Sequence, residues 1–240
     1  MGRNSLKNFV MLFLIVILSA CGSSKHTVKA QIESESTETA KAAEVVIPNT
    51  IAAKFREGSH YMRISDDSEL PTSSDKIQIT EFFLYSCPHC YELEPKLQKW
   101  LEKYDNVEFT RVPAILGPSW SEMAKFYYVA EKLGKLDTLH KKFFYENQQS
   151  KNKFISELSI RQYFVLNGIE ESDYAKAYYD EEVMEKTSQA RILSIKYNLR
   201  GVPVVIVNNK WKVAPYFVRD QEQMLELLDY LIELEAGGGQ

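Results

Sequence analysis

The feature that most constrains the fold of this chain is a pair of cysteines at the point where a strand pattern changes to a helix pattern. Residues 76–85 (KIQITEFFLY) are rich in β-branched and aromatic side chains, as is typical of a strand buried on both faces. The motif CPHC follows at residues 87–90, and apolar side chains then recur at helical spacing from Leu93 to Tyr104. Another strand pattern, VEFTRV, occupies residues 107–112. This succession predicts two parallel strands joined by a right-handed helical crossover.

A block of helical patterns separates this unit from a second group of strands. Residues 119–196 carry successive helix patterns, and one of them is predicted to start at a capping Ser172. Strand patterns return at residues 204–207 and 210–213, on either side of an Asn-Asn turn. An amphipathic helix pattern closes the chain at residues 219–235.

The element order predicts an α/β fold in two parts. A mixed sheet with its helices would be built from residues 51–118 and 197–240, and an all-helical domain would be inserted at residues 119–196. Residues 21–50 lack apolar periodicity and are rich in Ser, Thr, Glu, Lys and Ala. We therefore expect a flexible tether ahead of the folded part.

Residues 1–20 have the pattern of a secretory signal peptide. Arg3 and Lys7 precede an apolar run at residues 9–18, which is shorter than the about 20 residues that a membrane span needs. Leu-Ser-Ala then leads into Cys21, which resembles a bacterial lipobox, in which the cysteine is acylated and becomes the mature N-terminus. The alternative is an uncleaved membrane anchor. The lipobox predicts a palmitate-carrying lipoprotein outside the cytoplasm, on either the inner or the outer membrane.

Composition narrows the classes of function. The net charge of −4 gives no basic surface, so we expect no nucleic-acid partner. Three cysteines are too few for a four-cysteine zinc site or a disulfide-rich scaffold. With Cys21 acylated, Cys87 and Cys90 are the remaining thiols, in a compartment where disulfides persist.

The CPHC motif has the arrangement of a redox-active dithiol. Unpaired backbone N–H groups and the dipole at a helix start favour an anion, so the pKa of Cys87 is predicted to fall well below ~8.5. A spacing of three places Cys90 on the same helical face, one turn further in and less exposed. Pro88 suits the first helical turn, and His89 brings an imidazole or N–H donor close to the sulfur of Cys87. Because a stable thiolate favours the reduced form, the Cys87–Cys90 disulfide would be a strong oxidant.

Two other interpretations of the motif are weaker. A pair of cysteines two residues apart can be half of a zinc site, but such a site needs four ligands, and His60 and His140 lie in unrelated segments. The pair can also be a structural disulfide, but so small a ring gains little loop entropy. We therefore expect no metal, and no cofactor beyond the redox-active disulfide Cys87–Cys90.

These features resemble the DsbA-type periplasmic thiol:disulfide oxidoreductases of bacteria, in a membrane-anchored lipoprotein form. The matching residues are Glu81-Phe82-Phe83, the motif at residues 87–90, and Arg200-Gly201-Val202-Pro203 before a strand. The likeness covers residues 51–235. It implies a thioredoxin-like domain with an inserted helical domain, which agrees with the element order.

The resemblance also implies roles for residues outside the motif. Pro203 would follow a cis peptide bond and face the disulfide, and Val202 would pair with an extended substrate segment by strand addition. The alternative is an ordinary trans proline at a strand start. Glu81 would tune the pKa of the buried cysteine or exchange a proton with it, unless it is a solvated charge at a strand end. The family often pairs this glutamate with a lysine on the neighbouring strand, where this chain has Thr110 and Arg111, and an arginine cannot relay a proton.

The resemblance predicts an enzyme, a dithiol oxidase that donates the Cys87–Cys90 disulfide to newly exported, unfolded proteins with free thiols. We expect a periplasmic monomer, held on the lipid bilayer by Cys21 and reoxidised by an integral-membrane, quinone-linked oxidase of the DsbB type. One alternative is a disulfide reductase or isomerase of the same fold. The other is a non-catalytic lipoprotein chaperone.

Overall fold

The computed structural model of the protein describes residues 54–64, 76–150, 154 and 156–237. They belong to one compact unit, Glu44–Gln240. The predicted signal peptide, most of the predicted tether and the predicted lipidation site Cys21 precede that unit, and the whole of residues 1–50 lies outside the described residues. In the part of the chain that is described, no helix has both the length and the apolar character that a membrane crossing requires.

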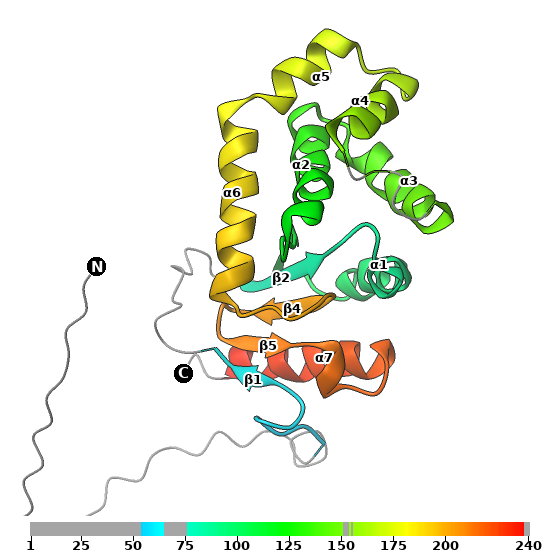
Figure 1. Ribbon diagram of the computed structural model, residues 1–240. Coiled ribbons are helices and arrows are strands. Elements are labelled where there is room, and N and C mark those ends of the chain that lie inside the picture. The colour runs from blue at the N-terminus through cyan, green and yellow to red at the C-terminus, as the bar shows by residue number, and fades with distance from the viewer. Residues whose placement is uncertain (1–53, 65–75, 151–153, 155, 238–240) are drawn as a thin grey trace, which may run out of the picture. The chain divides into compact units, whose positions relative to one another are not determined.

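A mixed sheet with strand order β1-β5-β4-β2-β3 lies at the centre of the fold (Figure 1). β2 (Ile77–Phe83) pairs in parallel with β3 (Val107–Pro113), so the predicted parallel pairing around the CPHC motif is confirmed. β4 (Val204–Val207) runs antiparallel to β2, and β5 (Trp211–Val213) runs antiparallel to β4. β1 (Met62–Arg63) pairs with β5 at the sheet edge. The sheet is therefore mixed, as the element order predicts.

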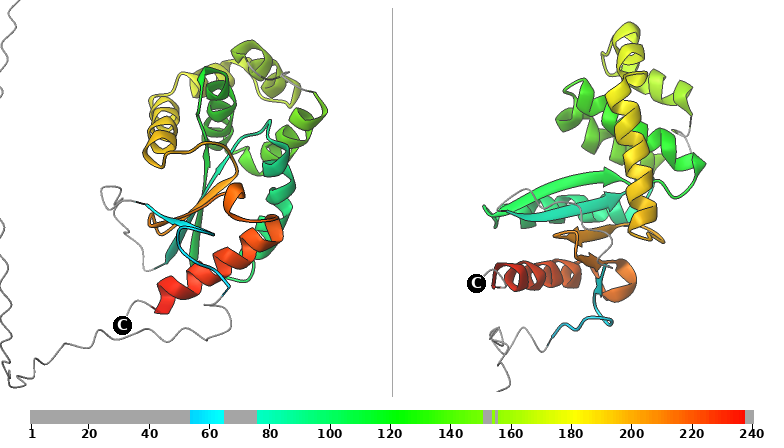
Figure 2. Two further views of the ribbon diagram at one scale, coloured as in Figure 1. Left: turned by 60° about the horizontal axis from the view of Figure 1, so that its bottom comes forward. Right: turned by 90° about the vertical axis from the view of Figure 1, so that its left-hand side faces the viewer.

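Helices cover both faces of this sheet. Figure 2 shows the helices that lie between β3 and β4 in sequence gathered on one side of the sheet, and α7 on the opposite side. Their bounds are α1 (Pro88–Leu101), α2 (Pro118–Lys132), α3 (Leu136–Gln149), α4 (Glu157–Leu166), α5 (Glu171–Tyr178), α6 (Glu181–Lys196) and α7 (Gln221–Gly237), with a 3₁₀ turn at Pro215–Phe217.

Two hydrophobic clusters hold these layers together. On one face of the sheet, Ile79 packs with Leu97 of α1 and Leu228 of α7. On the other face, Phe82 and Ile206 pack with the side chains of α2 to α6. Each large side chain that is fully buried in this way contributes about 1.5–3 kcal/mol to folding. In the first half of β2, buried isoleucines alternate with half-buried polar residues, whereas residues 81–83 at its end are all buried, so both faces of the sheet are covered there.

The hairpin predicted at residues 204–213 is present. Asn208 and Asn209 form its turn with φ of 49° and 54°, both in the left-handed region. A two-residue turn of type I′ requires positive φ at both positions, and asparagine tolerates it better than most residues. The N–H of Lys210 closes the turn on the carbonyl of Val207 at 2.9 Å, and the register then pairs Val207 with Trp211, so Lys210 belongs to the loop and not to β5.

The predicted helix cap at Ser172 is wrong. α5 begins at Glu171, and its N-cap is Glu170, in an extended conformation with φ of −61° and ψ of 138°. Glu171 and Asp173 occupy the first turn, where carboxylates interact favourably with the helix dipole. A serine is a frequent cap but not an obligatory one, as α4 shows by contrast: there Ser156 caps the helix and forms a capping box with Ser159.

Candidate active site

Cys87 stands at the N-terminal end of α1, as the sequence predicts. It is the N-cap residue, with extended dihedrals (φ −86°, ψ 117°), and Pro88 occupies the first turn. Its backbone N–H donates to the carbonyl of Leu84 at 3.0 Å, and its carbonyl accepts from the N–H of Tyr91 at 3.1 Å. The end of β2 and the start of α1 therefore fix the backbone on both sides of the sulfur.

The two cysteines are unlinked in this structure and have opposite environments. Cys87 is half-buried, and its pKa is lowered to about 6. A hydrogen bond from the Cys90 thiol is the largest cause, and the backbone N–H groups of Cys90 and His89 add to it against the effect of burial. Cys90 is fully buried, and burial, followed by Cys87 and Glu81, raises its pKa well above the ordinary value. At neutral pH, Cys87 is thus the thiolate and Cys90 keeps its proton.

His89 acts on the sulfur through its backbone N–H and through the charge of its ring. The ring itself is exposed, and its Nδ1 lies 3.7 Å from the carboxylate of Glu92. The carbonyl of His89 accepts a hydrogen bond from Nε2 of Gln221 at 2.8 Å. α7 therefore holds the first turn of α1 beside the cysteines.

The structure brings Val202 and Pro203 to the reactive sulfur. The Val202–Pro203 peptide bond is cis, as the resemblance implies, and the trans alternative is not found. The sulfur of Cys87 lies 3.5 Å from the carbonyl oxygen of Val202, and it donates a hydrogen bond to that oxygen only when the thiol is protonated. A pocket of about 170 Å³ adjoins this point between His89 and Pro203 on one side and Val218 and Met224 on the other.

Glu81 is a fully buried carboxylate on β2. Its partner in the strand register is Arg111 of β3, whose Nε lies 3.4 Å from Oε2 of Glu81. Within the described residues, neither oxygen of Glu81 has a hydrogen-bond partner, so this contact is a charge contact only. Burial raises the pKa of Glu81 to about 8, although Arg111 lowers it. Where the resemblance implies a lysine, the structure has Arg111, and the interpretation of Glu81 as a solvated strand-end charge is wrong.

Arg111 is shared between two carboxylates. Its Nη2 donates to Oε1 of Glu94 at 2.8 Å and its Nε to Oε2 at 3.2 Å, so Glu94 receives the bidentate pair. Nε2 of His140 lies 3.5 Å from the same carboxylate. Burial opposes ionisation of Glu94, but His140 and Arg111 hold its pKa below the ordinary value. Because Arg111 is engaged by Glu94, Glu81 is left with little neutralising contact.

A family model described as a DSBA-like thioredoxin domain matches residues 78–231. The chain belongs to this DsbA family. The thiol:disulfide interchange protein DsbA of Azotobacter vinelandii is 32% identical over 173 residues, which cover 70% of this chain and 81% of that protein. DsbA of Pseudomonas aeruginosa is 29% identical over 186 residues, covering 77% and 87%. A crystal structure of P. aeruginosa DsbA superposes with a TM-score of 0.71 at 28% identity, over 78% of this chain and 97% of that one.

As a DsbA-family member, the protein is a disulfide oxidoreductase with a thioredoxin-like fold. The family works with a redox-active disulfide and needs no external cofactor. Among the residues that the structure describes, no group of three or more His, Cys, Asp or Glu side chains could hold a metal ion. The chemistry therefore rests on the two sulfurs and the groups around them.

Sequence reasoning missed three members of this DsbA-type site. Glu94 lies four residues after Cys90, on the buried face of α1, and a charged residue among apolar neighbours is a signal that could have indicated it. His140 sits at an apolar position of α3 and carried the same signal. The hydroxyl of Tyr85 lies 2.7 Å from Nδ1 of His140. Nothing in the sequence indicates that contact, because it depends on how α3 packs against the end of β2.

Proposed function

We propose that the protein is a dithiol oxidase that passes the Cys87–Cys90 disulfide to exported proteins with free thiols. The observation that carries this proposal is that the pKa values of the two cysteines are shifted in opposite directions. The pKa of Cys87 falls to about 6, whereas burial keeps Cys90 protonated. A stabilised thiolate favours the reduced form over the disulfide, so the disulfide is a strong oxidant.

In the first step, a substrate thiolate attacks the accessible sulfur of Cys87. A disulfide forms between the substrate and Cys87, and the Cys87–Cys90 bond breaks with its electron pair going to Cys90. A buried thiolate is costly, so the sulfur of Cys90 takes up a proton. Glu81 supplies that proton. Its raised pKa of about 8 keeps it protonated at neutral pH, and ionised Glu81 raises the pKa of Cys90, so the two groups are electrostatically coupled.

In the second step, another substrate thiolate attacks the substrate sulfur of the mixed disulfide. The substrate disulfide forms, and Cys87 leaves as a thiolate. Its low pKa makes it a good leaving group, so this step is fast. The substrate has lost two electrons, and the Cys87–Cys90 pair has gained them.

The substrate is held by its backbone beside the reactive sulfur. Val202, whose carbonyl lies 3.5 Å from the sulfur of Cys87, pairs with an extended substrate segment by strand addition, and Pro203 shapes the loop that presents it. Such binding reads main-chain groups, so it suits unfolded polypeptides of many sequences. Pro88 and His89 tune the potential from the first turn of α1.

The protein works in the periplasm as a lipoprotein acylated at Cys21, with residues 1–20 removed and residues 21–50 as the tether. A quinone-linked membrane oxidase of the DsbB type reoxidises the Cys87–Cys90 pair. The support for this location is the signal-peptide pattern and the cysteine after Leu-Ser-Ala. The support for the reoxidising partner is membership of the DsbA family. From the order of elements in the sequence, we also propose that the helical block at residues 119–196 is an inserted domain. We propose that the protein is a monomer.

Oxidation of a reduced two-cysteine peptide tests the proposal. Cys87→Ser should abolish it, whereas Ser86→Ala, one residue away with the dithiol intact, should leave it near the native rate. Unchanged oxidation by Cys87→Ser would contradict the proposal. A Cys87→Ala, Cys90→Ala double variant that complements an oxidase-deficient strain would instead indicate a non-catalytic chaperone.

A further inference from the structure

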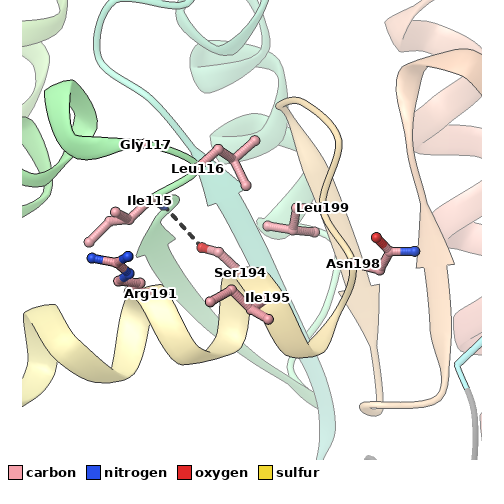
Figure 3. A pocket seen from close by; sticks show the side chains of 8 residues that line it. All are labelled: Ile115, Leu116, Gly117, Arg191, Ser194, Ile195, Asn198 and Leu199. Atoms are coloured by element: carbon pink, nitrogen blue, oxygen red, sulfur yellow. Dashed lines mark hydrogen bonds between the residues drawn. The ribbon is translucent and has the colours of Figure 1, made fainter. Parts of the chain in front are cut away.

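A second pocket opens where the end of α6 meets the segment after β3 (Figure 3). Its volume is about 280 Å³, enough for one or two side chains. It is lined by Ile115 and Leu116 after β3, by Arg191, Ser194 and Ile195 of α6, and by Leu199 after α6.

One wall of this pocket is close in sequence to the residues that face the reactive sulfur. Leu199 lies three residues before Val202, whose carbonyl is 3.5 Å from the sulfur of Cys87. Three residues span at most about 10 Å. β2 and β3 run parallel, so Cys87 after β2 and Ile115 after β3 both lie at the carboxyl ends of these strands, at the same end of the sheet. A polypeptide paired with Val202 would therefore reach the pocket within a few residues of its own cysteine.

The walls of the pocket are fixed without a ligand. The hydroxyl of Ser194 accepts a hydrogen bond from the N–H of Ile115 at 3.0 Å (Figure 3). It also donates one to the carbonyl of Ala190 at 2.7 Å. The N–H of Leu199 donates to the carbonyl of Ser194 at 3.0 Å. A preformed pocket loses little ordering entropy when a side chain enters it.

The pocket combines apolar walls with a cationic side chain. Leu116 is 38% exposed and Ile195 is 68% exposed, although both are large apolar residues. Residues 191–200 (RILSIKYNLR) contain Arg191, Lys196 and Arg200 and no acidic residue, in a chain whose net charge is −4. Within the described residues, no ion pair engages any of these three cations. The surface is thus suited to an apolar side chain with a carboxylate beside it.

We propose that this pocket is a substrate subsite that favours exported polypeptides with an apolar and an acidic residue close to the reacting cysteine. The proposal rests on the dithiol-oxidase function proposed above and adds a sequence preference to it. Backbone pairing at Val202 accepts many sequences, so the side-chain contacts of the pocket would provide the discrimination. The preference acts on encounter and binding, not on the reactivity of Cys87.

Matched two-cysteine peptides test the subsite. One peptide carries Leu-Glu close to the reacting cysteine, a second carries Leu-Lys at the same place, and a third is neutral and polar there. Each peptide is made in two versions, with these two residues either before or after the cysteine, because a strand can be added in either chain direction. For the native protein, kcat/KM for Leu-Glu should exceed that for Leu-Lys by about two- to fivefold in one placement, which is the effect expected of a single charge pair screened by solvent. The difference in kcat/KM should shrink with added salt.

Variants in the pocket should change this preference. Arg191→Glu should reverse the order of Leu-Glu and Leu-Lys, and Ile195→Asn should reduce the advantage of the Leu-Glu peptide over the neutral, polar one. Lys135→Glu makes the same charge change at an exposed residue outside the pocket and should leave the preference intact. All variants should keep the native equilibrium with glutathione, because none touches the cysteines.

The outcomes separate this proposal from the function on which it rests. Equal kcat/KM for the three peptides in both placements, with the neutral peptide still oxidised, would overturn the subsite alone. An unchanged preference in Arg191→Glu would do the same. Failure to oxidise any peptide would instead contradict the dithiol-oxidase function.

Discussion

At the scale of single residues, position decides what a cysteine does. Cys87 and Cys90 are the same side chain three residues apart, yet the pKa of one falls and that of the other rises. Cys87 is half-buried at the N-cap, where thiol and backbone donors converge on its sulfur, whereas Cys90 is enclosed in the core. The same asymmetry makes Cys87 the point of attack and the better leaving group.

The lowered pKa of Cys87 should appear in the pH dependence of stability. Folding shifts this pKa from 9.0 to about 6, so the unfolded chain binds the proton more tightly. The free energy of unfolding of the reduced protein should therefore rise from about pH 6 to about pH 9, and this contribution is lost as the pH falls through about 6. The oxidised protein has no Cys87 thiol and should lack the contribution. Urea unfolding of both forms across this range measures the difference, and a pH-independent difference would contradict the account.

Glu81 should have the opposite dependence. Its pKa rises from 4.5 in the unfolded chain to about 8 in the folded protein, so stability is lost as the pH rises through this window. Glu81→Gln removes the titration. In the oxidised protein, the stability of the native chain relative to Glu81→Gln should thus fall between about pH 4.5 and about pH 8. Glu108→Gln, at an exposed position of the neighbouring strand, is the control; a native-minus-Glu81→Gln difference that does not change with pH would show that Glu81 does not titrate in this window.

The sequence pattern locates Cys87, Pro88 and Cys90 at the strand-to-helix junction. The family resemblance adds Glu81, Val202 and Pro203. The bidentate pair between Arg111 and Glu94 could not be predicted, because it depends on the register of β3 and the rotation of α1. Such contacts between elements are set by packing, which local patterns do not encode.

At the scale of elements, one face of α3 holds the residue that precedes the redox motif. His140, Phe144 and Gln148 are spaced by four, so they share a helix face. The hydroxyl of Tyr85 lies 2.7 Å from Nδ1 of His140, and the carbonyl of Tyr85 accepts from Nε2 of Gln148 at 2.8 Å. The rings of Tyr85 and Phe144 are 4.7 Å apart. α3 therefore fixes Tyr85 two residues before the reactive sulfur.

His140→Phe tests how strongly α3 is attached at this point. The variant fills similar space but leaves the buried hydroxyl of Tyr85 without its partner and removes the imidazole that lies 3.5 Å from Glu94. We expect a loss of about 1–3 kcal/mol in the free energy of unfolding, measured with urea. Lys141→Ala, exposed on the same helix, should change it by less than about 0.5 kcal/mol. If the two variants are equally stable, the contact between His140 and Tyr85 contributes nothing.

Elements with strong local signals were predicted well. These elements are β2, α1, β3 and the hairpin of β4 and β5. Each has a sequence pattern that is compatible with few other secondary structures. The start of α5 was predicted wrongly, because Ser172 has a capping side chain but Glu170 has the extended backbone that a cap requires. Side-chain preference is weaker than backbone geometry at helix ends.

At the scale of the whole molecule, the strand order places three chain segments at the same end of the sheet, where β2 and β3 end and β4 begins. β2 lies between β4 and β3, so the Cys87 loop, the loop of Pro203 and the segment after β3 are neighbours there. The element order in the sequence predicts the fold class, but not this order of strands. The redox site and the proposed subsite both follow from it.

The proposed anchor can be tested on the full chain expressed in a Gram-negative host. The native protein should partition into the detergent phase of a Triton X-114 extract and carry acyl chains at Cys21 by mass spectrometry, because two or more acyl chains bind a bilayer stably. Cys21→Ser should move it to the aqueous phase with the dithiol intact. A native protein in the aqueous phase would contradict the lipoprotein proposal and leave the oxidase proposal standing.

The central claim is that the dithiol form of the Cys87–Cys90 pair is the favoured one. Equilibration of the protein with a glutathione redox buffer, followed by alkylation of free thiols, gives the reduction potential directly. The account predicts a potential far above the ~−270 mV of thioredoxin, toward the ~−120 mV that characterises DsbA. A potential at or below that of thioredoxin would mean that the pair prefers its disulfide, and the protein would then reduce or isomerise disulfides instead of donating one.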